Sequence, residues 1–437
     1  MRYPVLLLVP LVACHSTPSP SAKAASSAPP PSADATSAMA SNAVDVRLDS
    51  GFADAPRHLA DGNTAFAFDL YGAVRKGQHN LALSPLSISL AVTMAWTGAR
   101  GDTAAQMKTV LHAGDLDSTL DGDAKLLAWL RNPTETVTLR VANRLFGERT
   151  CAFNQNYLTR TSAAFGDTLE ALDFANAPDV SRQHINEWIA TETGGHIMNL
   201  IPALGVASST RLVLASALYF LGLWERPFSA EATKPAAFHV SSAHARDVPT
   251  MHEVEGLLFA HTDGVKVLQI PYRGGQLGMV FVLPDAVDAL DAVESRMSPA
   301  ALAGWLGAMG LSRVKVALPR FEINAAPLAL RDVLTTLGMP LAFDRNKADF
   351  TGIADTPRSG DRLAIGDVFH KTFVRVDERG TEATAATAVV MRPMAIRSDP
   401  PEEFTADHPF LFLLRDIGTG TMLFMGRVVD PIAPPSL

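Results

Sequence analysis

Two hydrophobic periodicities alternate along this chain and predict its elements. Residues 84–98 open with a serine–proline pair, stop at a glycine, and are apolar around most of a helical circumference, which predicts a buried central helix. Phe66 and Leu70 share one face of an earlier helix. We expect Asp61 or Asn63 to cap that helix at its N-terminus.

Period-two alternation and short apolar runs predict strands in much of the remaining chain. The predicted strands cover residues 137–145, 267–272, 277–283, 314–318, 410–414 and 422–425. The last two are continuously apolar, which is typical of fully buried core strands. Because helices concentrate early and strands late, the layout is a mixed α/β fold with large antiparallel sheets, not a regular βαβ winding.

One segment fits neither pattern. Residues 381–390 are rich in alanine and threonine and contain no turn residue after Gly380. In an extended conformation one face carries only small side chains, those of Thr381, Ala383, Ala385 and Thr387. Such a segment can enter an existing sheet without needing large new pockets. Its alanine content is equally compatible with a helix.

The N-terminus has the composition of a leader and a spacer. Residues 1–14 carry one positive charge and an apolar run that is too short for a transmembrane helix and ends at Cys14. That ending resembles the bacterial lipobox, in which the cysteine is diacylated; an ordinary cleaved signal is the alternative. Residues 15–44 are mostly Ser, Pro, Ala and Thr and predict a disordered tether. We therefore expect a lipid anchor in a bacterial cell envelope, periplasmic or surface-exposed, with extracellular release as a further route.

Composition narrows the possible partners. A net charge of -8 without a basic stripe gives no reason to expect nucleic acid. The 47% hydrophobic content suits one domain over residues 45–432, in which no second linker or repeat occurs. If Cys14 is lipidated, Cys151 has no disulfide partner and is expected to be a buried packing residue. No cofactor or metal site is indicated.

Motifs in a fixed order carry a resemblance over nearly the whole domain. The segment Glu378-x-Gly380-Thr381-Glu382-Ala383-Thr384-Ala385-Ala386-Thr387 resembles the mobile hinge of inhibitory serpins. Further stretches resemble serpin motifs at compatible spacings: Asn80 to Ile88, Leu214 to Phe220, Trp224 to Phe228, Val248 to Met251, Leu318 to Phe321, Phe369 to Lys371, Asp407 to Phe410 and Leu423 to Val428. One such match would be weak, but this many in order identify a chain similar to the serpin family.

The resemblance implies a mixed α/β fold with three β-sheets, about nine helices and an exposed reactive loop over residues 378–403. It also implies a suicide-substrate mechanism, in which a serine protease becomes acylated onto the loop and the cleaved loop inserts into the main sheet, as is known of this family. A charge at Thr381 or Ala383 would be costly to desolvate, and neither carries one, which favours an inhibitory member. The expected partner is a serine protease held covalently by a monomer, with membrane contact only through the lipid anchor.

The hinge-to-bond distance usual in the family places cleavage between Met394 and Ala395. An unbranched apolar side chain at Met394 suits chymotrypsin-, elastase- and subtilisin-like pockets. Arg397-Ser398 stays open as a trypsin-type site if the effective loop is longer. Arg392 is a poor site because Pro393 follows it.

Two further sites follow from the resemblance. Ser84, Ser87 and His370 correspond to a hydrogen-bonded cluster beneath the opening sheet, to which the family usually adds an asparagine from the neighbouring strand. This chain has Ser216 there, whose side chain is shorter and has no amide donors. Trp224 corresponds to an aromatic residue where the loop first enters the sheet. Without the resemblance, His370 would be read simply as a satisfied buried histidine.

Two other function classes compete with inhibition. Ser312 and Lys315 fit the S-x-x-K pattern of penicillin-interacting enzymes, but they lie in a strand pattern without a K-T-G partner, and no G-x-S-x-G elbow occurs. The nearer alternative is a non-inhibitory serpin-like protein that acts in binding or as a chaperone. We therefore expect no enzymatic activity of the chain itself, and an inhibitor of serine-type endopeptidases.

Overall fold

A computed structural model describes residues 57–77, 79–130, 137–166, 169–324, 326–355, 362–381 and 400–431. The predicted leader with Cys14, the tether, the hinge from Glu382 onward and the Met394–Ala395 bond lie outside these residues. Within the described ranges no helix is long and apolar enough to span a membrane.

Nine α-helices and two short 3-10 helices lie in the described ranges, as the resemblance implied. They are α1 (Arg57–Val74), α2 (Pro85–Trp96), α3 (Gly101–Val110), α4 (Leu116–Leu130), α5 (Gln155–Phe165), α6 (Pro178–Glu192), α7 (Leu290–Ser295), α8 (Pro299–Gly307), α9 (Arg331–Leu337), η2 (Ala230–Ala232) and η3 (Pro340–Phe343). The start of α2 is as predicted, because the Ser84 side chain caps it by accepting a hydrogen bond from the Ser87 N–H. The predicted cap of α1 is wrong: Asp61 and Asn63 lie inside the helix, which begins at Arg57 and already buries Ala60 in its early turns.

The strands in the described ranges form two hydrogen-bonded networks. The seven-stranded sheet has the order β10-β12-β13-β4-β2-β3 with β11 beside β12, and the nine-stranded sheet has the order β1-β16-β15-β8-β7-β6-β9-β14 with β5 beside β6. Their bounds are β1 (Leu81–Leu83), β2 (Val137–Glu148), β3 (Glu170–Leu172), β4 (Leu212–Leu223), β5 (Lys234–Ser241), β6 (His244–Thr262), β7 (Val265–Pro271), β8 (Leu277–Pro284), β9 (Gly310–Pro319), β10 (Phe321–Ile323), β11 (Leu328–Ala329), β12 (Ile365–Asp377), β13 (Gly380–Thr381), β14 (Glu402–Thr405), β15 (Phe410–Asp416) and β16 (Met422–Val428).

The described strands form two hydrogen-bonded networks, whereas the resemblance implied three sheets. The 19-residue β6 pairs with β5 near its start, with β9 through its middle and with β7 at its end. This long strand therefore pairs with three others and keeps the nine strands in one continuous sheet.

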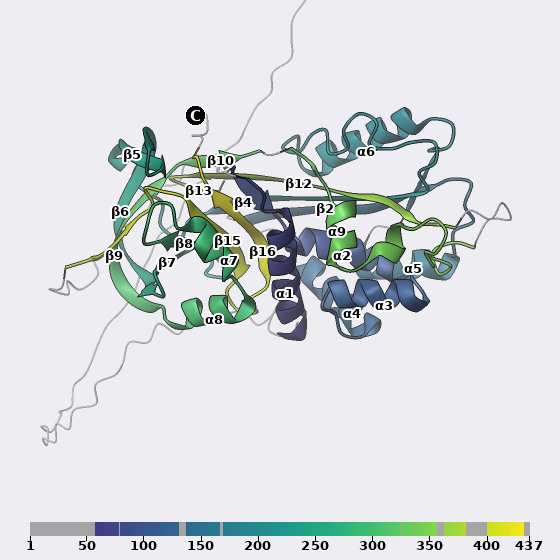
Figure 1. The fold of residues 1–437 in the computed structure, drawn as a ribbon, viewed down its shortest axis with the longest axis horizontal. Helices are drawn as coiled ribbons and strands as arrows, with labels where there is room; N and C mark the ends of the chain where they lie inside the picture. Colours follow the sequence, from purple (N-terminus) through teal and green to yellow (C-terminus); the bar gives the residue numbers. More distant parts are fainter. Residues whose placement is uncertain are drawn as a thin grey trace, which may run out of the picture. The chain divides into compact units, whose positions relative to one another are not determined.

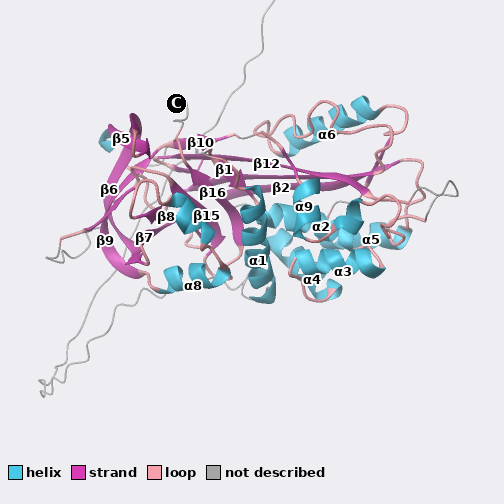
Figure 2. Ribbon diagram, viewed as in Figure 1, coloured by secondary structure: helices cyan, strands magenta, loops and turns pink. Residues whose placement is uncertain are grey.

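Helices cover both faces of the seven-stranded sheet (Figure 1). α2 packs against β2 and β4 on one face, whereas α6 contacts the same two strands from the other (Figure 2). α2 is the buried central helix that the sequence predicted, with Ile88, Leu90 and Val92 almost fully shielded from solvent. A movement of β4 would therefore change its packing contacts with α2.

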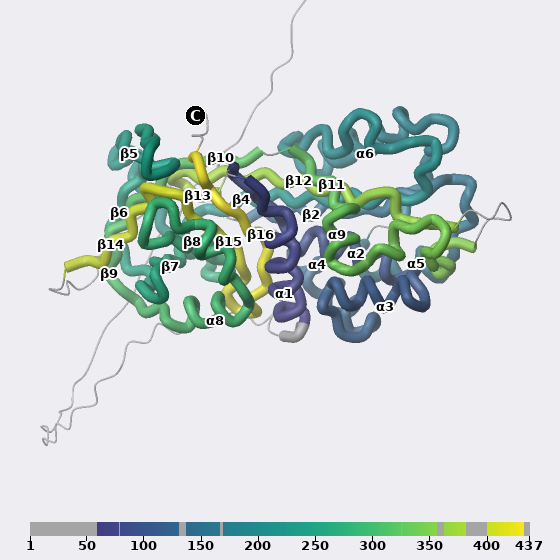
Figure 3. Tube along the Cα trace, viewed as in Figure 1, coloured from purple at the N-terminus to yellow at the C-terminus, as the bar shows by residue number. Residues whose placement is uncertain are grey.

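The strand pairing in the middle of the seven-stranded sheet differs between its two ends. β12 and β4 run parallel and pair directly from Ile365 beside Leu212 to Phe373 beside Tyr219. Beyond that point they separate, and β13 lies between them, antiparallel to both. The trace in Figure 3 shows β13 next to β4, although the two are far apart in sequence. The described start of the hinge thus occupies the open end of this sheet.

Candidate functional site at the open end of the seven-stranded sheet

A tight turn carries the chain from β12 back into β13. The Asp377 carboxylate accepts a hydrogen bond from the Arg379 N–H at 2.9 Å. The carbonyl oxygens of Glu378 and Arg379 accept hydrogen bonds from the backbone N–H groups of Phe228 (2.8 Å) and Trp224 (2.9 Å). Because both peptide groups of the turn are bonded to the segment after β4, the hinge starts from a fixed point.

Residue 380 must be a glycine because its backbone lies very close to β4. Its φ of 151° lies in the region that favours glycine, and a Cβ there would meet the carbonyl oxygen of Gly222 at 1.9 Å. No side chain can occupy that space while β13 stays paired. The glycine of the predicted hinge therefore allows the chain to enter between β12 and β4.

Thr381 is the first inward-facing hinge residue, and it is already buried, with 1% of its surface exposed. Its hydroxyl lies 2.7 Å from that of Tyr272, whose ring stacks on Trp224 at 4.5 Å between centroids. The Trp224 Nε1–H donates to the Asp377 carbonyl oxygen at 3.0 Å. Burial raises the pKa of Tyr272, so its hydroxyl stays protonated. Trp224 thus lies beside the turn and the start of β13. Tyr272 is a contact of Thr381 that the sequence did not predict.

Glu378 ties the base of the hinge to the rest of the molecule. One carboxylate oxygen accepts hydrogen bonds from the Arg320 Nε (2.7 Å) and Nη2 and from the Thr233 hydroxyl. Burial opposes ionisation of Glu378, but the bonds from Arg320 and Thr233 outweigh it, so its pKa lies below the ordinary value. The start of the hinge is therefore held by an ion pair as well as by the sheet.

A directional chain of hydrogen bonds lies beneath the paired part of β12 and β4. The Ser84 N–H donates to His370 Nε2 at 3.0 Å, so the proton sits on Nδ1, which faces the Ser216 hydroxyl at 3.2 Å. The Ser216 and Ser87 hydroxyls are 2.8 Å apart, and Ser87 donates to Asn143 Oδ1 at 2.8 Å. Burial lowers the pKa of His370 to about 3, so the ring is neutral at physiological pH.

The structure brings the four predicted cluster residues together and adds a fifth. The amide that Ser216 lacks comes from Asn143 on β2, directly opposite Ser216 in the ladder, and its Nδ2 also donates to the Ser87 carbonyl oxygen at 2.9 Å. A sequence signal for Asn143 existed: it falls in step with Leu139 and Leu145 on the inward face of the predicted strand. A polar side chain at an inward position needs a polar partner.

The remaining candidates do not form a reactive site. Cys151 is a buried free thiol whose pKa is raised by burial, in accord with a packing role. Ser312 and Lys315 are three residues apart on β9 and therefore point to opposite faces, and Lys315 Nζ pairs with Glu403 at 3.0 Å. No cluster of three or more His, Cys, Asp or Glu side chains that could hold a metal occurs in the ranges described.

Comparison with known proteins gives matches over most of the chain. The family model described as "Serpin (serine protease inhibitor)" matches residues 61–431. Human Serpin B3 is 37% identical over 398 residues, covering 85% of this chain and 99% of the relative. Rat leukocyte elastase inhibitor A is 36% identical over 384 residues, with 85% and 99% covered. The structure of human thyroxine-binding globulin complexed with thyroxine superposes with a TM-score of 0.77 at 26% identity, covering 85% of this chain and 98% of that one.

The family match reaches from α1 to beyond β16 and includes the hinge and the buried serine–histidine cluster. The mixed α/β fold with its nine helices in the described ranges agrees with this match. The chain therefore belongs to the serpin family.

Proposed function

We propose that this chain inhibits serine proteases as a suicide substrate. Family membership and its inhibitory relatives support protease inhibition, not catalysis by the chain itself. The observation that carries the proposal is β13: the first two inserting hinge residues are already paired between β12 and β4. The sheet thus has an opening whose occupant is the start of the reactive loop.

The proposed reaction begins as ordinary proteolysis. The protease serine oxygen attacks the carbonyl carbon of Met394, the Met394–Ala395 peptide bond breaks, and the Ala395 nitrogen leaves as a free amine after taking a proton. An acyl ester then joins Met394 to the protease. Loop insertion drags the protease away and distorts its active site before water can hydrolyse the ester. Arg397–Ser398 is the alternative cleavage point for a trypsin-like protease.

β13 sets the register in which insertion would proceed. From Thr381, each further hinge residue moves one position back along β4 from Gly222 and along β12 from Val376. Residues 382–391 would then reach Leu212 at the far end of β4, just short of Met394. The length of β4 therefore fits the segment that cleavage at Met394 would release.

The same register gives insertion a driving force. The direct β12–β4 pairing is parallel, and an inserted strand would replace it with two antiparallel ladders, which are slightly more stable per residue. The inward residues Ala383 and Ala385 are small enough to enter without displacing the core. Thr387 would arrive between Ser216 and His370, where its hydroxyl can bond to the buried cluster.

Complex formation tests the proposal. The purified protein is incubated with chymotrypsin and with elastase, and a covalent complex that survives SDS is expected, together with a large rise in the melting temperature of the cleaved chain. Cleavage without any complex at every ratio of the two proteins would contradict inhibition. Sequencing the released fragment then decides between Ala395 and Ser398 as its first residue.

The second candidate is a non-inhibitory serpin that binds another molecule. The observation that favours this candidate is the structural similarity to thyroxine-binding globulin, which was solved in complex with thyroxine. Such a protein would be cleaved in the loop without trapping the protease. The charge-free hinge at Thr381 and Ala383 is the feature that favours inhibition over this candidate.

We also propose that the domain acts as a monomer from a lipid anchor at Cys14 on a bacterial cell envelope, with residues 15–44 as the tether. The support is the apolar run before Cys14 and the Ser/Pro/Ala/Thr composition after it. Replacing Cys14 with alanine is expected to move the protein from the membrane fraction to the soluble fraction. An unchanged distribution would argue for an ordinary signal.

A further inference from the structure

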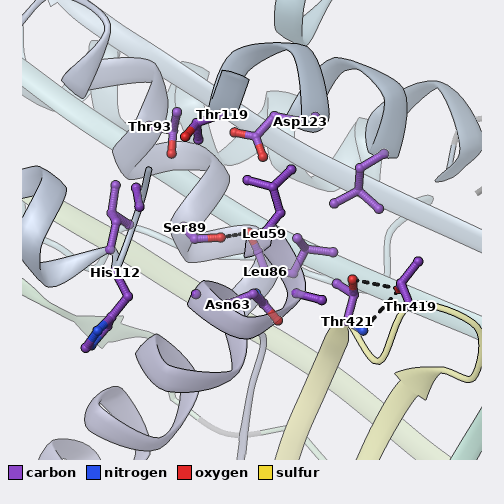
Figure 4. A pocket seen from close by; sticks show the side chains of 16 residues that line it. Leu59, Asn63, Leu86, Ser89, Thr93, His112, Thr119, Asp123, Thr419 and Thr421 are labelled. Carbon is purple, nitrogen blue, oxygen red and sulfur yellow. Dashed lines mark hydrogen bonds between the residues drawn. The ribbon is translucent and has the colours of Figure 1, made fainter. Parts of the chain in front are cut away.

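A cavity of about 50 Å³ lies away from the hinge, between α1, α2, α4 and the turn that joins β15 to β16 (Figure 4). Much of its lining is apolar, including Leu59, Leu86, Leu111 and Leu126. This volume has room for several waters or for a group of a few heavy atoms. Two polar side chains in its wall each have one buried atom that forms no hydrogen bond with any described residue.

Asp123 is the first of these groups. It sits on α4 in the buried stripe formed with Leu120, Leu126 and Leu127, and 8% of its surface is exposed. Its Oδ2 has no hydrogen-bond partner among the residues that the structure describes. Burial raises the pKa of Asp123 to about 8, and no cation or donor in the described part of the chain offsets this effect. The helix thus carries a carboxyl group where its pattern calls for an apolar residue.

Asn63 on α1 is the second group. Its Oδ1 accepts a hydrogen bond from the Met422 N–H at 3.0 Å, and a backbone N–H can only donate, so the orientation of the amide is fixed. Its Nδ2 is buried, and no described residue forms a hydrogen bond with it. Figure 4 shows Asp123 and Asn63 on different elements of the same pocket wall. The cavity therefore offers an acceptor on one element and a donor on another.

The residues that line the cavity supply no positive charge to balance Asp123. Among them the only other titratable side chain is His112, whose Nε2 pairs with Asp69 at 2.6 Å on the exposed surface. Thr419 and Thr421 also line it, but their hydroxyls bond to each other at 2.9 Å and Thr419 bonds to Asp416. Water can satisfy hydrogen bonds here while Asp123 stays protonated, but a bound cation would allow Asp123 to ionise.

We propose that this cavity binds a short aliphatic primary amine that carries a hydrogen-bond acceptor at its other end. The ammonium group pairs with the Asp123 carboxylate, the alkyl chain lies among the leucines, and the acceptor receives the Asn63 Nδ2–H. Because Asp123 is largely protonated at neutral pH, binding of the ammonium ion releases the carboxyl proton to solvent. This site is separate from the hinge and from the serine–histidine cluster.

Titration calorimetry with 3-amino-1-propanol tests the proposal on the whole protein. Saturable binding is expected at pH 8 with a dissociation constant of about 1 mM, an affinity within reach of so small a ligand. Proton release should appear as a dependence of the heat on the buffer. Binding should weaken by about tenfold for each pH unit below the pKa of Asp123. 1-Propanol, which lacks the amine, should bind at least tenfold more weakly.

Two variants make the test specific. Asp123→Asn should weaken binding of the amino alcohol by about tenfold or more, whereas Asp121→Asn, on the exposed face of the same helix, should leave it unchanged. Asn63→Ala should weaken binding of the amino alcohol but not of n-propylamine, and it serves if Asp123→Asn does not fold. No saturable binding to the wild type, equal binding to Asp123→Asn, or equal affinity at pH 6 and pH 8 would overturn the proposal and leave a water-filled cavity.

Discussion

The hydroxyl of Thr381 lies 2.7 Å from the hydroxyl of Tyr272, at a buried position between two strands that pair directly elsewhere along their length. Tyr272 in turn stacks on Trp224, which holds the turn at Asp377. The first inward side chain of the hinge thus has a prepared pocket that accepts a small hydroxyl. We infer that insertion continues from an existing start, so that the hinge does not have to find its register after cleavage.

Replacing Thr381 with arginine should convert an inhibitor into a substrate. A guanidinium group in this pocket would lose its hydration without gaining an anion, at a cost of about 3–5 kcal/mol. We expect the yield of SDS-stable complex to fall more than tenfold while loop cleavage continues. Glu382→Arg is the matched control, because residue 382 would face the opposite side of the inserted strand. Equal loss of complex in both variants would contradict the assigned facing of the hinge.

Replacing Asn143 with alanine should loosen the paired part of the sheet. The Ser87 hydroxyl loses its acceptor and the Ser87 carbonyl oxygen loses a donor, which should cost about 1–3 kcal/mol and lower the melting temperature of the uncleaved protein. Adding Ser216→Asn to this variant places an amide on β4 beside the Ser87 hydroxyl. It should recover part of the lost melting temperature. If Asn143→Ala melts at the wild-type temperature, the amide has no stabilising role.

Acid should weaken the native state through His370. Its folded-state pKa of about 3 lies below the ordinary value of 6.5, so the unfolded chain binds the extra proton first as the pH falls. The stability contribution is complete above pH 6.5 and is lost toward pH 3, by at most about 1.4 kcal/mol per pH unit. Urea unfolding of the wild type between pH 7 and pH 4 should therefore show a steeper loss than that of His370→Gln. Parallel curves would mean that another group carries the acid sensitivity.

The proposed register can be tested at Thr387. Its hydroxyl would meet Ser216 and His370 only after insertion, so Thr387→Val should destabilise the cleaved protein by about 1 kcal/mol and leave the uncleaved protein unchanged. Thr384→Val faces the other side and serves as the control. Melting curves before and after loop cleavage make the comparison. A shift in the cleaved Thr384→Val protein, with none in Thr387→Val, would mean that the even-numbered residues face inward, which contradicts the proposed register.

Sequence patterns predicted the elements that carry their own periodicity. α2 begins at its Ser84 cap, β2, β7 and β8 lie where the sequence predicted strands, and β15 and β16 are buried as continuous apolar runs should be. The 19-residue strand β6 was not predicted. Proline and glycine weaken a strand interior, yet β6 continues past both Pro249 and Gly256. Pairing with β5 and β9 outweighs the local preference of these residues.

The site was predictable only where family motifs marked it. Ser84, Ser216 and His370 are distant in sequence and meet only because β4 and β12 pair above α2. Tyr272 was missed because it is an unremarkable residue at a strand's end until its partner is known. Asn143 is a polar residue at an inward strand position, but that signal does not say which residue it bonds to. The position of Gly380 depends on the backbone of Gly222, a contact that no local pattern encodes.

The central claim is that a protease is trapped as an acyl ester at Met394, and mass spectrometry of the chymotrypsin reaction tests it most directly. We predict an SDS-stable complex of one protease with one inhibitor, release of a peptide that begins at Ala395, and recovery of a chain ending at Met394 when alkali hydrolyses the ester. Quantitative cleavage at Met394 with fully active protease and no complex at any ratio would contradict the account.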